Sequence, residues 1–489
     1  MKKTFLRISS LLIALVTVLM TFVACQKGDE TEENQSGVSG GDNVTTNVEE
    51  TAPVPDKDWG GKPFNVLSVQ KSYEPNFEIV GELTGSRVEP AVFRRNLWIK
   101  ETYNIDIQQY GDADDKHLDI LSSQIQAGDT DYDLVFMYRE NMASAIQSGY
   151  MKDLTRIEHI DLSNDWYNKS TIDSMMISGR LFHMVSDFSL VDKARTNVLF
   201  LNRDLAADNN IPDILDMVRD GSWTVDKMVQ YEIALSKDLN GDGEMNLSDS
   251  WGLACGGREV CSTLWCSLGN ESVSVDKLGN WTVNLATDHS VSSIDIVRSM
   301  MAPEVSFFEN KFGSYSDAMD VFVNKQCLFL SETLSAIEKV SPDANFSFTA
   351  LPYPKYDIEQ TQYYTTNDNT FCATFGIPVC ASDYSFSGFM VEVLSWQSHT
   401  TTYPEYYNVI CKVRNSYDEE CAEMVDRVFE GLVFDFGLLN GANIKGLRAL
   451  IENSVFKNTS IATGYDGQKT AIMGYIEIIF DAVAMIDPE

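Results

Sequence analysis

The feature that most constrains the fold is a regular alternation of apolar runs and amphipathic stretches. Runs of strand length alternate with segments whose apolar residues recur at helical spacing, as Val92, Ile99 and Tyr103 do. The expected strands are 64–69, 105–107 and 133–138, and the expected helices are 88–103, 118–127 and 141–148. Strands separated by such helices form parallel βαβ units, whose ligands bind beyond the carboxyl ends of the strands. We therefore expect an α/β fold with ligand loops after Val69 and Tyr138.

The pattern continues along the chain and then becomes helical. Further strands are expected at 179–184, which reads as hairpin-like, and at 196–202, 326–331, 346–351 and 370–378. Further helices are expected at 203–209, at 225–237 with Thr224 as N-cap, and up to Val340, and the chain from Tyr384 is mainly helical. A folded part of about 430 residues is too long for one core, so we expect two domains.

The N-terminus has the pattern of an export signal. A basic head with Lys2, Lys3 and Arg7 precedes an apolar run over 11–23, which is too short for a spanning helix. Ala24-Cys25 then resembles a bacterial lipobox, which implies cleavage before Cys25 and lipidation of its sulfur. The alternative is an ordinary secretory signal with an incidental cysteine. We expect a lipid-anchored protein on the extracellular face of the cell membrane.

The segment after Cys25 reads as a disordered tether. It is rich in Gly, Ser, Thr, Asn and Glu and cannot bury enough apolar surface to offset its ordering entropy. Folding is expected to begin near Asp58. The formal net charge of −35, without blocks of basic residues, disfavours nucleic acid as a partner.

The cysteines after Cys25 do not have the pattern of a disulfide scaffold or a zinc site. Their positions are 255, 261, 266, 327, 372, 380, 411 and 421. No pair of CxxC motifs, and no His at zinc spacing, accompanies them. We expect most of them to be small buried apolar residues, and the sequence does not give any pairing.

A twelve-residue loop has the spacing of a calcium site. Its oxygen-bearing residues are Asp238, Asn240, Asp242, Glu244 (through its carbonyl), Asn246 and Asp249. Gly243 holds the sixth position, as the sharp turn of an EF-hand-like loop requires. Asp at the last position has a shorter reach than the usual Glu. We expect structural Ca²⁺ here and no organic cofactor; the alternative is an acidic turn without metal.

Four phrases, in this order, resemble the extracellular solute-binding proteins of ABC importers, in the sugar-binding, maltodextrin-binding-protein-like group. They are Asp131–Val135, Ser148–Leu154, Val198–Leu205 and Ser222–Thr224. The resemblance covers roughly residues 60 to 400, and the helical tail resembles a divergent lipoprotein branch. It implies a two-lobed, type II periplasmic-binding-protein fold with a ligand cleft at the hinge. The implied organisation is 1–24 signal peptide, 25–58 tether, 60–190 plus 365–400 lobe 1, and 195–355 plus 401–489 lobe 2.

Sugar sites combine aromatic platforms with hydrogen-bonding side chains, and the resemblance implies where they lie. The candidates are Tyr73, Tyr138, Arg139 and Glu140 in strand-end loops, Asp187, Phe188, Asn367 and Asn369 near the crossings between lobes, Glu332 directly after the strand that ends in Ser331, and Trp265 in a region that faces the cleft in relatives. For each, the alternative is an ordinary surface or core residue. Trp223 and Trp251 are expected to be structural.

The function implied is noncovalent capture of a small ligand, an oligosaccharide above all, for delivery by a monomer to an ABC permease. No catalytic motif is visible, such as GxSxG, HExxH or a P-loop, so we expect no enzyme. One alternative is a secreted, lipid-anchored hydrolase acting on glycans, which needs two carboxylates across a scissile bond. Another is a surface adhesion or scaffold lipoprotein.

Overall fold

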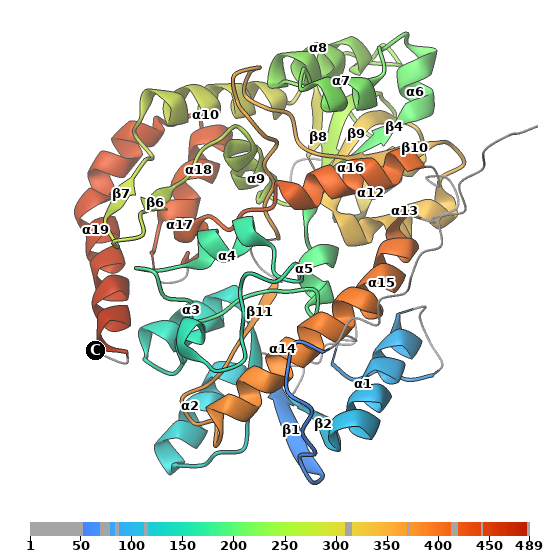
Figure 1. Cartoon of the computed structure of the whole chain (residues 1–489). Coiled ribbons are helices and arrows are strands. Elements are labelled where there is room, and N and C mark those ends of the chain that lie inside the picture. Colours follow the sequence, from blue (N-terminus) through green and yellow to red (C-terminus); the bar gives the residue numbers. More distant parts are fainter. Residues whose placement is uncertain are drawn as a thin grey trace, which may run out of the picture. The chain divides into compact units, whose positions relative to one another are not determined.

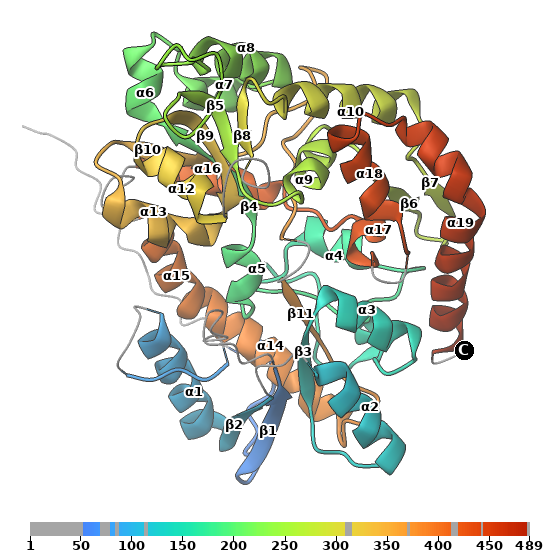
Figure 2. The same ribbon diagram turned by 180° about the vertical axis from the view of Figure 1, so that it is seen from behind.

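Two sheets with flanking helices organise the chain in a computed structural model (Figure 1; Figure 2). The structure describes residues 52–68, 79–83, 88–111, 116–308, 315–368, 372–411, 419–441 and 444–486. All of them belong to one compact unit, Ala52–Glu489. The signal peptide, most of the tether, Cys25, Tyr73 and Asn369 lie outside the described residues.

The first sheet has the order β11-β3-β1-β2. It consists of β1 (Lys62–Leu67), β2 (Ile105–Tyr110), β3 (Leu134–Tyr138) and β11 (Ala373–Gly376). Its connecting helices are α1 (Glu89–Tyr103) and α2 (His117–Ala127), and α3 (Arg139–Gln147) follows β3. β1 pairs in parallel with both β2 and β3, which confirms the predicted βαβ units. All five residues of β3 are buried, because its apolar run lies in the middle of the sheet.

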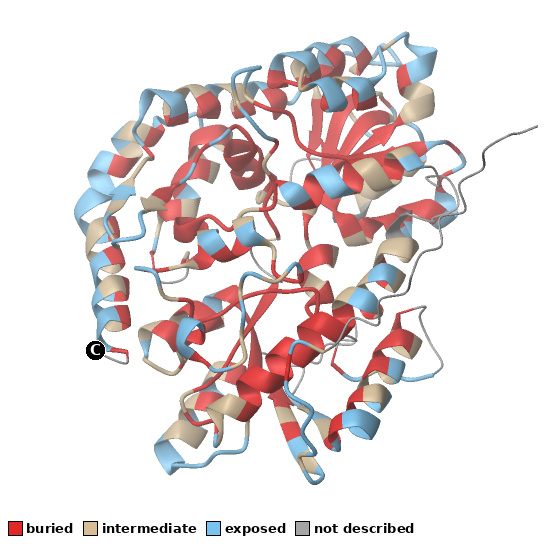
Figure 3. Ribbon diagram, in the orientation of Figure 1, coloured by how far each residue is buried: buried red, intermediate tan, exposed pale blue. Residues whose placement is uncertain are grey.

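The second sheet has the order β10-β4-β9-β5-β8. Its strands are β4 (Asn197–Asn202), β5 (Trp251–Cys255), β8 (Ser306–Phe308), β9 (Cys327–Thr333) and β10 (Phe348–Leu351). β5 is parallel to β8 and β9, whereas β4 is antiparallel to β9 and β10. A separate ribbon joins β6 (Val273–Val275) to β7 (Trp281–Val283). Figure 3 shows the large sheets buried beneath helices that expose their outer faces.

The helices fill most of the remaining chain. Between the sheets in sequence are η1 (Leu154–Arg156), α4 (Lys169–Met175) and α5 (Leu190–Ala194). Around the second sheet are α6 (Arg203–Asp208), α7 (Ile214–Asp220), α8 (Val225–Leu235), α9 (Val260–Ser267), α10 (Asp288–Met300), α12 (Tyr315–Val323), η2 (Leu334–Ala336) and α13 (Ile337–Asp343). The tail contains α14 (Tyr384–Thr400), α15 (Thr402–Cys411), α16 (Glu419–Glu430), α17 (Phe436–Leu439), α18 (Leu447–Phe456) and α19 (Ile461–Met485).

The tail contacts elements of both halves of the chain. α16 packs against β10, and α18 packs against α9, α10 and α19. α19 in turn contacts α3, and the guanidinium of Arg180 donates to the carbonyls of Val483 (2.9 Å) and Ile486 (2.5 Å). No helix in the described part of the chain is both long and apolar enough to cross a membrane.

Two local predictions, the strand over 179–184 and the burial of the cysteines, have opposite outcomes. The expected strand over 179–184 is wrong: Ile177 bridges Arg180 around a tight turn, and Met184 bridges Phe375 of β11. Ser178 and Gly179 both have positive φ (54° and 74°), which closes the turn after two residues and leaves no strand. The expected burial of the cysteines is confirmed for the seven at 255, 261, 266, 327, 372, 380 and 421, which are free thiols.

Candidate functional site

The two sheets are connected where three chain segments meet. Thr196, just before β4, bridges Asn367, and the main-chain N–H of Asn197 donates to Thr366 at 2.9 Å. Thr365 bridges Leu432 of the tail. We call the residues 195–197, 364–368 and 431–433 the crossing region. The segment 364–368 lies in sequence between β10 of the second sheet and β11 of the first, so a rotation of one sheet against the other would act on it.

Arg139 ties the first sheet to the crossing region. It begins α3 directly after β3, is 2% exposed, and donates from Nη2 to the carbonyls of Asn367 (3.2 Å) and Asp368 (2.5 Å). Its guanidinium carbon lies 5.3 Å from the ring centroid of Phe434. Burial lowers the pKa of Arg139 from its ordinary value. The predicted strand-end residue Arg139 and the predicted crossing residue Asn367 are therefore in contact.

The side chain of Asn367 links neighbouring segments of the crossing region through buried hydrogen bonds. It is fully buried, and its Nδ2 donates to the carbonyl of Asp192 at 2.6 Å and to the hydroxyl of Thr196 at 3.3 Å. The hydroxyl of Thr196 also donates to the carbonyl of Asp192 at 2.8 Å. These bonds fix the backbone of two crossing segments relative to each other.

A buried ionic cluster flanks this point. Nζ of Lys193 lies 2.8 Å from Asp192 Oδ2 and 3.7 Å from Asp187 Oδ1, and Nδ1 of His399 lies 2.6 Å from Asp187 Oδ2. Burial raises the pKa of Asp192 to about 6, although the neighbouring ammonium of Lys193 opposes that rise. The predicted residue Asp187 thus lies in an ion-pair cluster beside the crossing region.

Several half-buried polar side chains of the crossing region were not predicted from the sequence. Arg195 Nη1 lies 3.6 Å from Asp368 Oδ2. Asn197 Nδ2 donates to the hydroxyls of Thr263 (3.0 Å) and Thr366 (3.3 Å), and those two hydroxyls are 3.1 Å apart. A sequence signal was present for Asp368, which directly follows the predicted residue Asn367. The nearby Tyr364 is also half-buried, and burial raises its pKa.

The remaining predicted ligand residues lie in varied environments. Glu140 is exposed beside Arg139, and Tyr138 is buried at the end of β3. Glu332 in β9 is 8% exposed and accepts the main-chain N–H of Thr333 at 2.7 Å. Phe188 and Trp265 are fully buried in separate apolar cores, and Phe188 packs against Phe136 and Phe375 with ring centroids 5.5 and 5.8 Å apart.

The loop 238–249 has its first and last carboxylates turned to the main chain. Asp238 accepts the N–H groups of Gly241 (2.7 Å) and Gly243 (2.8 Å), and the fully buried Asp249 accepts those of Leu239 (3.0 Å) and Asn246 (2.7 Å). In the described residues, no group of three His, Cys, Asp or Glu side chains is close enough to hold a metal. The loop's donors are all oxygens, the type that Ca²⁺ prefers.

Trp223 and Trp251 are fully buried, as expected of structural residues. The indole N–H of Trp223 donates to the carbonyl of Pro352 at 3.2 Å, and Trp251 packs edge-on against Phe307 at 5.7 Å. Both side chains therefore hold the second sheet to its surroundings.

No protein-family model and no curated protein sequence matches the chain. Solved structures do. The galacto-N-biose-/lacto-N-biose I-binding protein (GL-BP) of the ABC transporter from Bifidobacterium longum, solved with lacto-N-biose, matches with a TM-score of 0.59 at 9% identity, over 86% of this chain and 99% of GL-BP. The sugar-binding protein MalE from Xanthomonas citri matches with a TM-score of 0.59 at 12% identity, over 88% of this chain and 100% of MalE.

A third match is the GacH receptor of Streptomyces glaucescens, solved unliganded and with acarbose. Its TM-score is 0.54 at 11% identity, over 85% of this chain and 99% of GacH. Identities this low establish the fold alone. The chain has the two-lobed, type II periplasmic-binding-protein fold, as its sequence predicted, and the similar structures are of binding proteins rather than enzymes.

Proposed function

We propose that this protein is a lipid-anchored, extracellular solute-binding protein that captures an oligosaccharide and delivers it to an ABC permease. The observation that carries the proposal is the crossing region, where the end of β3, the start of β4 and the approach to β11 meet through Arg139, Thr196 and Asn367. In a two-lobed α/β fold, strand ends that converge on the connecting segments are where a ligand is held and where closure begins.

The chemistry of this region suits a sugar. Arg195, Asp368 and Asn197 supply charged and amide groups that are half-buried, and Tyr364 supplies a half-buried aromatic face. Sugars need both, because their ring faces are apolar and their rims carry hydroxyls. The buried residues Asn367 and Asp192 would act by positioning these groups. The similar structures solved with lacto-N-biose and acarbose support the same ligand class.

The anchor and the calcium loop are separate parts of the proposal. Lipidation of Cys25 would hold the receptor beside its permease, and the polar stretch that follows would let it search for ligand. Replacing Cys25 with Ser should move the protein from the membrane fraction to the medium. We also propose that Asp238, Asn240, Asp242 and Asp249 hold a structural Ca²⁺, with the carbonyl of Glu244 and the side chain of Asn246.

A thermal-shift screen against neutral glycans, polyols and peptides tests the function. A true ligand at 100 times its Kd should raise the free energy of unfolding by about 2.7 kcal/mol, since it binds only the folded state. Products of the same incubations should be analysed for cleavage. Stabilisation without cleavage supports a binding protein, whereas cleavage of a glycan would favour the hydrolase instead.

A further inference from the structure

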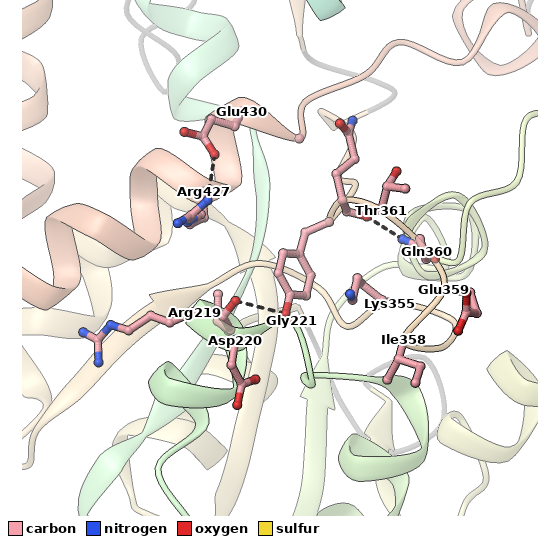
Figure 4. Close-up of a pocket in the computed structure, with 14 residues that line it drawn as sticks. Arg219, Asp220, Gly221, Lys355, Ile358, Glu359, Gln360, Thr361, Arg427 and Glu430 are labelled. Atoms are coloured by element: carbon pink, nitrogen blue, oxygen red, sulfur yellow. Dashed lines mark hydrogen bonds and ion pairs between the residues drawn. The ribbon is translucent and has the colours of Figure 1, made fainter.

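A pocket at the edge of the crossing region, with which it shares Gly431, contains an ammonium that makes no hydrogen bond or ion pair among the described residues. The pocket has a volume of about 430 Å³ and lies between the C-terminal end of α7, the loop after β10 and the C-terminal end of α16 (Figure 4). Its lining includes Lys355, Thr361, Gln362, Tyr363, Arg427 and Glu430. None of the ligand residues predicted from the sequence lines it. A volume of this size accommodates a small organic molecule.

Lys355 is the central feature of the pocket. Its side chain points into the pocket in Figure 4, and the residue is 5% exposed. Among the described residues, Nζ has no hydrogen bond and no carboxylate within 4 Å, and the centroid of the Tyr363 ring is 5.6 Å away. A Cβ on Gly221, whose φ is +79°, would lie 3.2 Å from Nζ, so the glycine leaves room around the ammonium.

The position of this ammonium is fixed by the backbone. The N–H of Lys355 donates to the carbonyl of Trp223 at 3.1 Å, and its carbonyl accepts the N–H of Val225 at 2.8 Å. Gln360 braces the same loop, since its amide donates to the carbonyls of Ser267 (2.9 Å) and Gln362 (2.8 Å). The site is therefore preorganised, which lowers the entropy lost on binding.

The other cations of the pocket already have carboxylate partners. Arg219 contacts Glu420 and Glu423, at 3.0 and 2.9 Å, and Arg427 lies 3.5 Å from Glu430. Lys355 is mostly buried and has no carboxylate in contact, so an anion arriving from solution would gain a charge-assisted hydrogen bond from it. The carboxylate of Asp220 interacts electrostatically with Lys355 but is exposed and not in ion-pair contact with it, so the ammonium can still accept an anionic group of a ligand.

The rest of the lining matches a hydroxylated ring. The hydroxyl of Tyr363 donates to the carbonyls of Met217 and Val218, each at 3.3 Å, which fixes the ring in the wall of the pocket. Thr361 and Gln362 are exposed and present a hydroxyl and an amide at the mouth. We infer that this pocket binds a monosaccharide carrying one anionic group, a carboxylate or a phosphate, with the anion on Lys355 and the ring on Tyr363. This site borders the crossing region at Gly431 but includes none of the residues proposed there to bind a ligand, so it does not depend on the proposed function.

Isothermal titration calorimetry with D-glucuronate, glucose 6-phosphate, glucose and inorganic phosphate tests the inference. At least one of the two sugar anions should bind, and neutral glucose and inorganic phosphate should each bind at least tenfold more weakly. The two sugar anions distinguish a carboxylate from a phosphate. Failure of both sugar anions to bind at millimolar concentration, or equal binding of glucose or inorganic phosphate, would overturn it.

Two variants locate the binding. Lys355→Met keeps the length of the side chain and should weaken binding of the sugar anion by about tenfold to a hundredfold, the effect of one charge-assisted hydrogen bond. The exposed Lys339→Met is the matched control and should bind as the parent does. Thr361→Trp fills the mouth from an exposed position, so it should abolish binding while the protein stays folded. Unchanged affinity in Lys355→Met and Thr361→Trp would place the anion elsewhere.

Discussion

Two buried lysines of this protein have opposite electrostatic surroundings. Lys193, beside the crossing region, lies within 3.7 Å of both Asp187 and Asp192, whereas Lys355, in the pocket beside α7, has no carboxylate within 4 Å among the described residues. A charge that the protein neutralises itself stabilises the arrangement of the chain. A charge that it leaves unmatched is available to a ligand. The surroundings of Lys193 therefore maintain the structure, whereas the pocket around Lys355 is suited to binding.

The largest expected effect comes from breaking the ion pair between Lys193 and Asp192. Asp192→Asn leaves the ammonium of Lys193 buried with only the more distant Asp187, so the free energy of unfolding should fall by about 3 kcal/mol. Urea denaturation measures this. The control is Asp173→Asn, which breaks the exposed pair with Lys169 at 2.7 Å and should cost less than about 0.5 kcal/mol. Equal effects of the two variants would show that the buried ion pairs beside the crossing region do not stabilise the fold.

The next effect depends on pH and tests whether the side chain of His183, which lies near Arg139, is shielded from water. Burial, and then the nearby charge of Arg139, lower the pKa of His183 to about 3. Below about pH 6.5 the side chain of His183 takes up a proton in the unfolded chain but not in the folded protein. The free energy of unfolding therefore falls as the pH falls toward 3. From pH 7 to pH 5 this amounts to about 2 kcal/mol. Urea titrations at both values should show this loss in the parent and not in His183→Gln. An equal loss in both proteins would contradict the assignment.

The loop 238–249 gives a smaller effect that depends on a cation rather than on an internal partner. Calcium at ten times its Kd should raise the free energy of unfolding by about 1.4 kcal/mol, and a chelator should reverse this. Asp242→Ala should remove the response, because its carboxylate is a proposed ligand at the exposed side of the loop. The exposed Asp226→Ala is the control and should keep the response. A parent protein that melts identically with calcium and with chelator would leave the loop as an acidic turn.

The smallest effect has the opposite sign. Lys355→Met removes a mostly buried charge and its contact with the Tyr363 ring but breaks no hydrogen bond or ion pair among the described residues, so the unliganded protein should become slightly more stable, by less than about 1 kcal/mol. Chemical denaturation of the unliganded variant and parent gives the difference. A marked destabilisation would mean that the ammonium of Lys355 supports the fold, in the way that Lys193 does.

The sequence predicted the parts of the fold that depend on local periodicity. The first sheet follows directly from apolar strands alternating with amphipathic helices, and β3 occurs within one residue of its expected place. Thr224 occupies the N-cap of α8 as predicted, although its side chain makes no cap hydrogen bond. The hairpin-like strand at 179–184 was wrong, because pairing with Phe375 depends on a residue almost two hundred positions away.

The site was predicted only in part, for a physical reason. Strand ends can be found from sequence, so Arg139 was predicted, and the family resemblance predicted Asn367 near a crossing between lobes. The two residues are in contact. Whether a charge is matched by a partner depends on tertiary packing, which no local pattern records. No local pattern in the sequence therefore indicates that Lys193 forms ion pairs with carboxylates and that Lys355 does not. Phe188 and Trp265 were chosen as aromatic candidates, but their full burial also depends on packing.

Binding of a small solute at the crossing region can be measured by calorimetry on variants of its half-buried residues. A neutral glycan found in the screen should bind the parent, and Asp368→Ala should weaken that binding at least about tenfold, as expected for loss of a hydrogen bond to a charged group. Arg94→Ala, an exposed change on α1, and Lys355→Met should both bind as the parent does. A glycan whose affinity is unchanged by Asp368→Ala, or the absence of binding by every solute, would contradict the account.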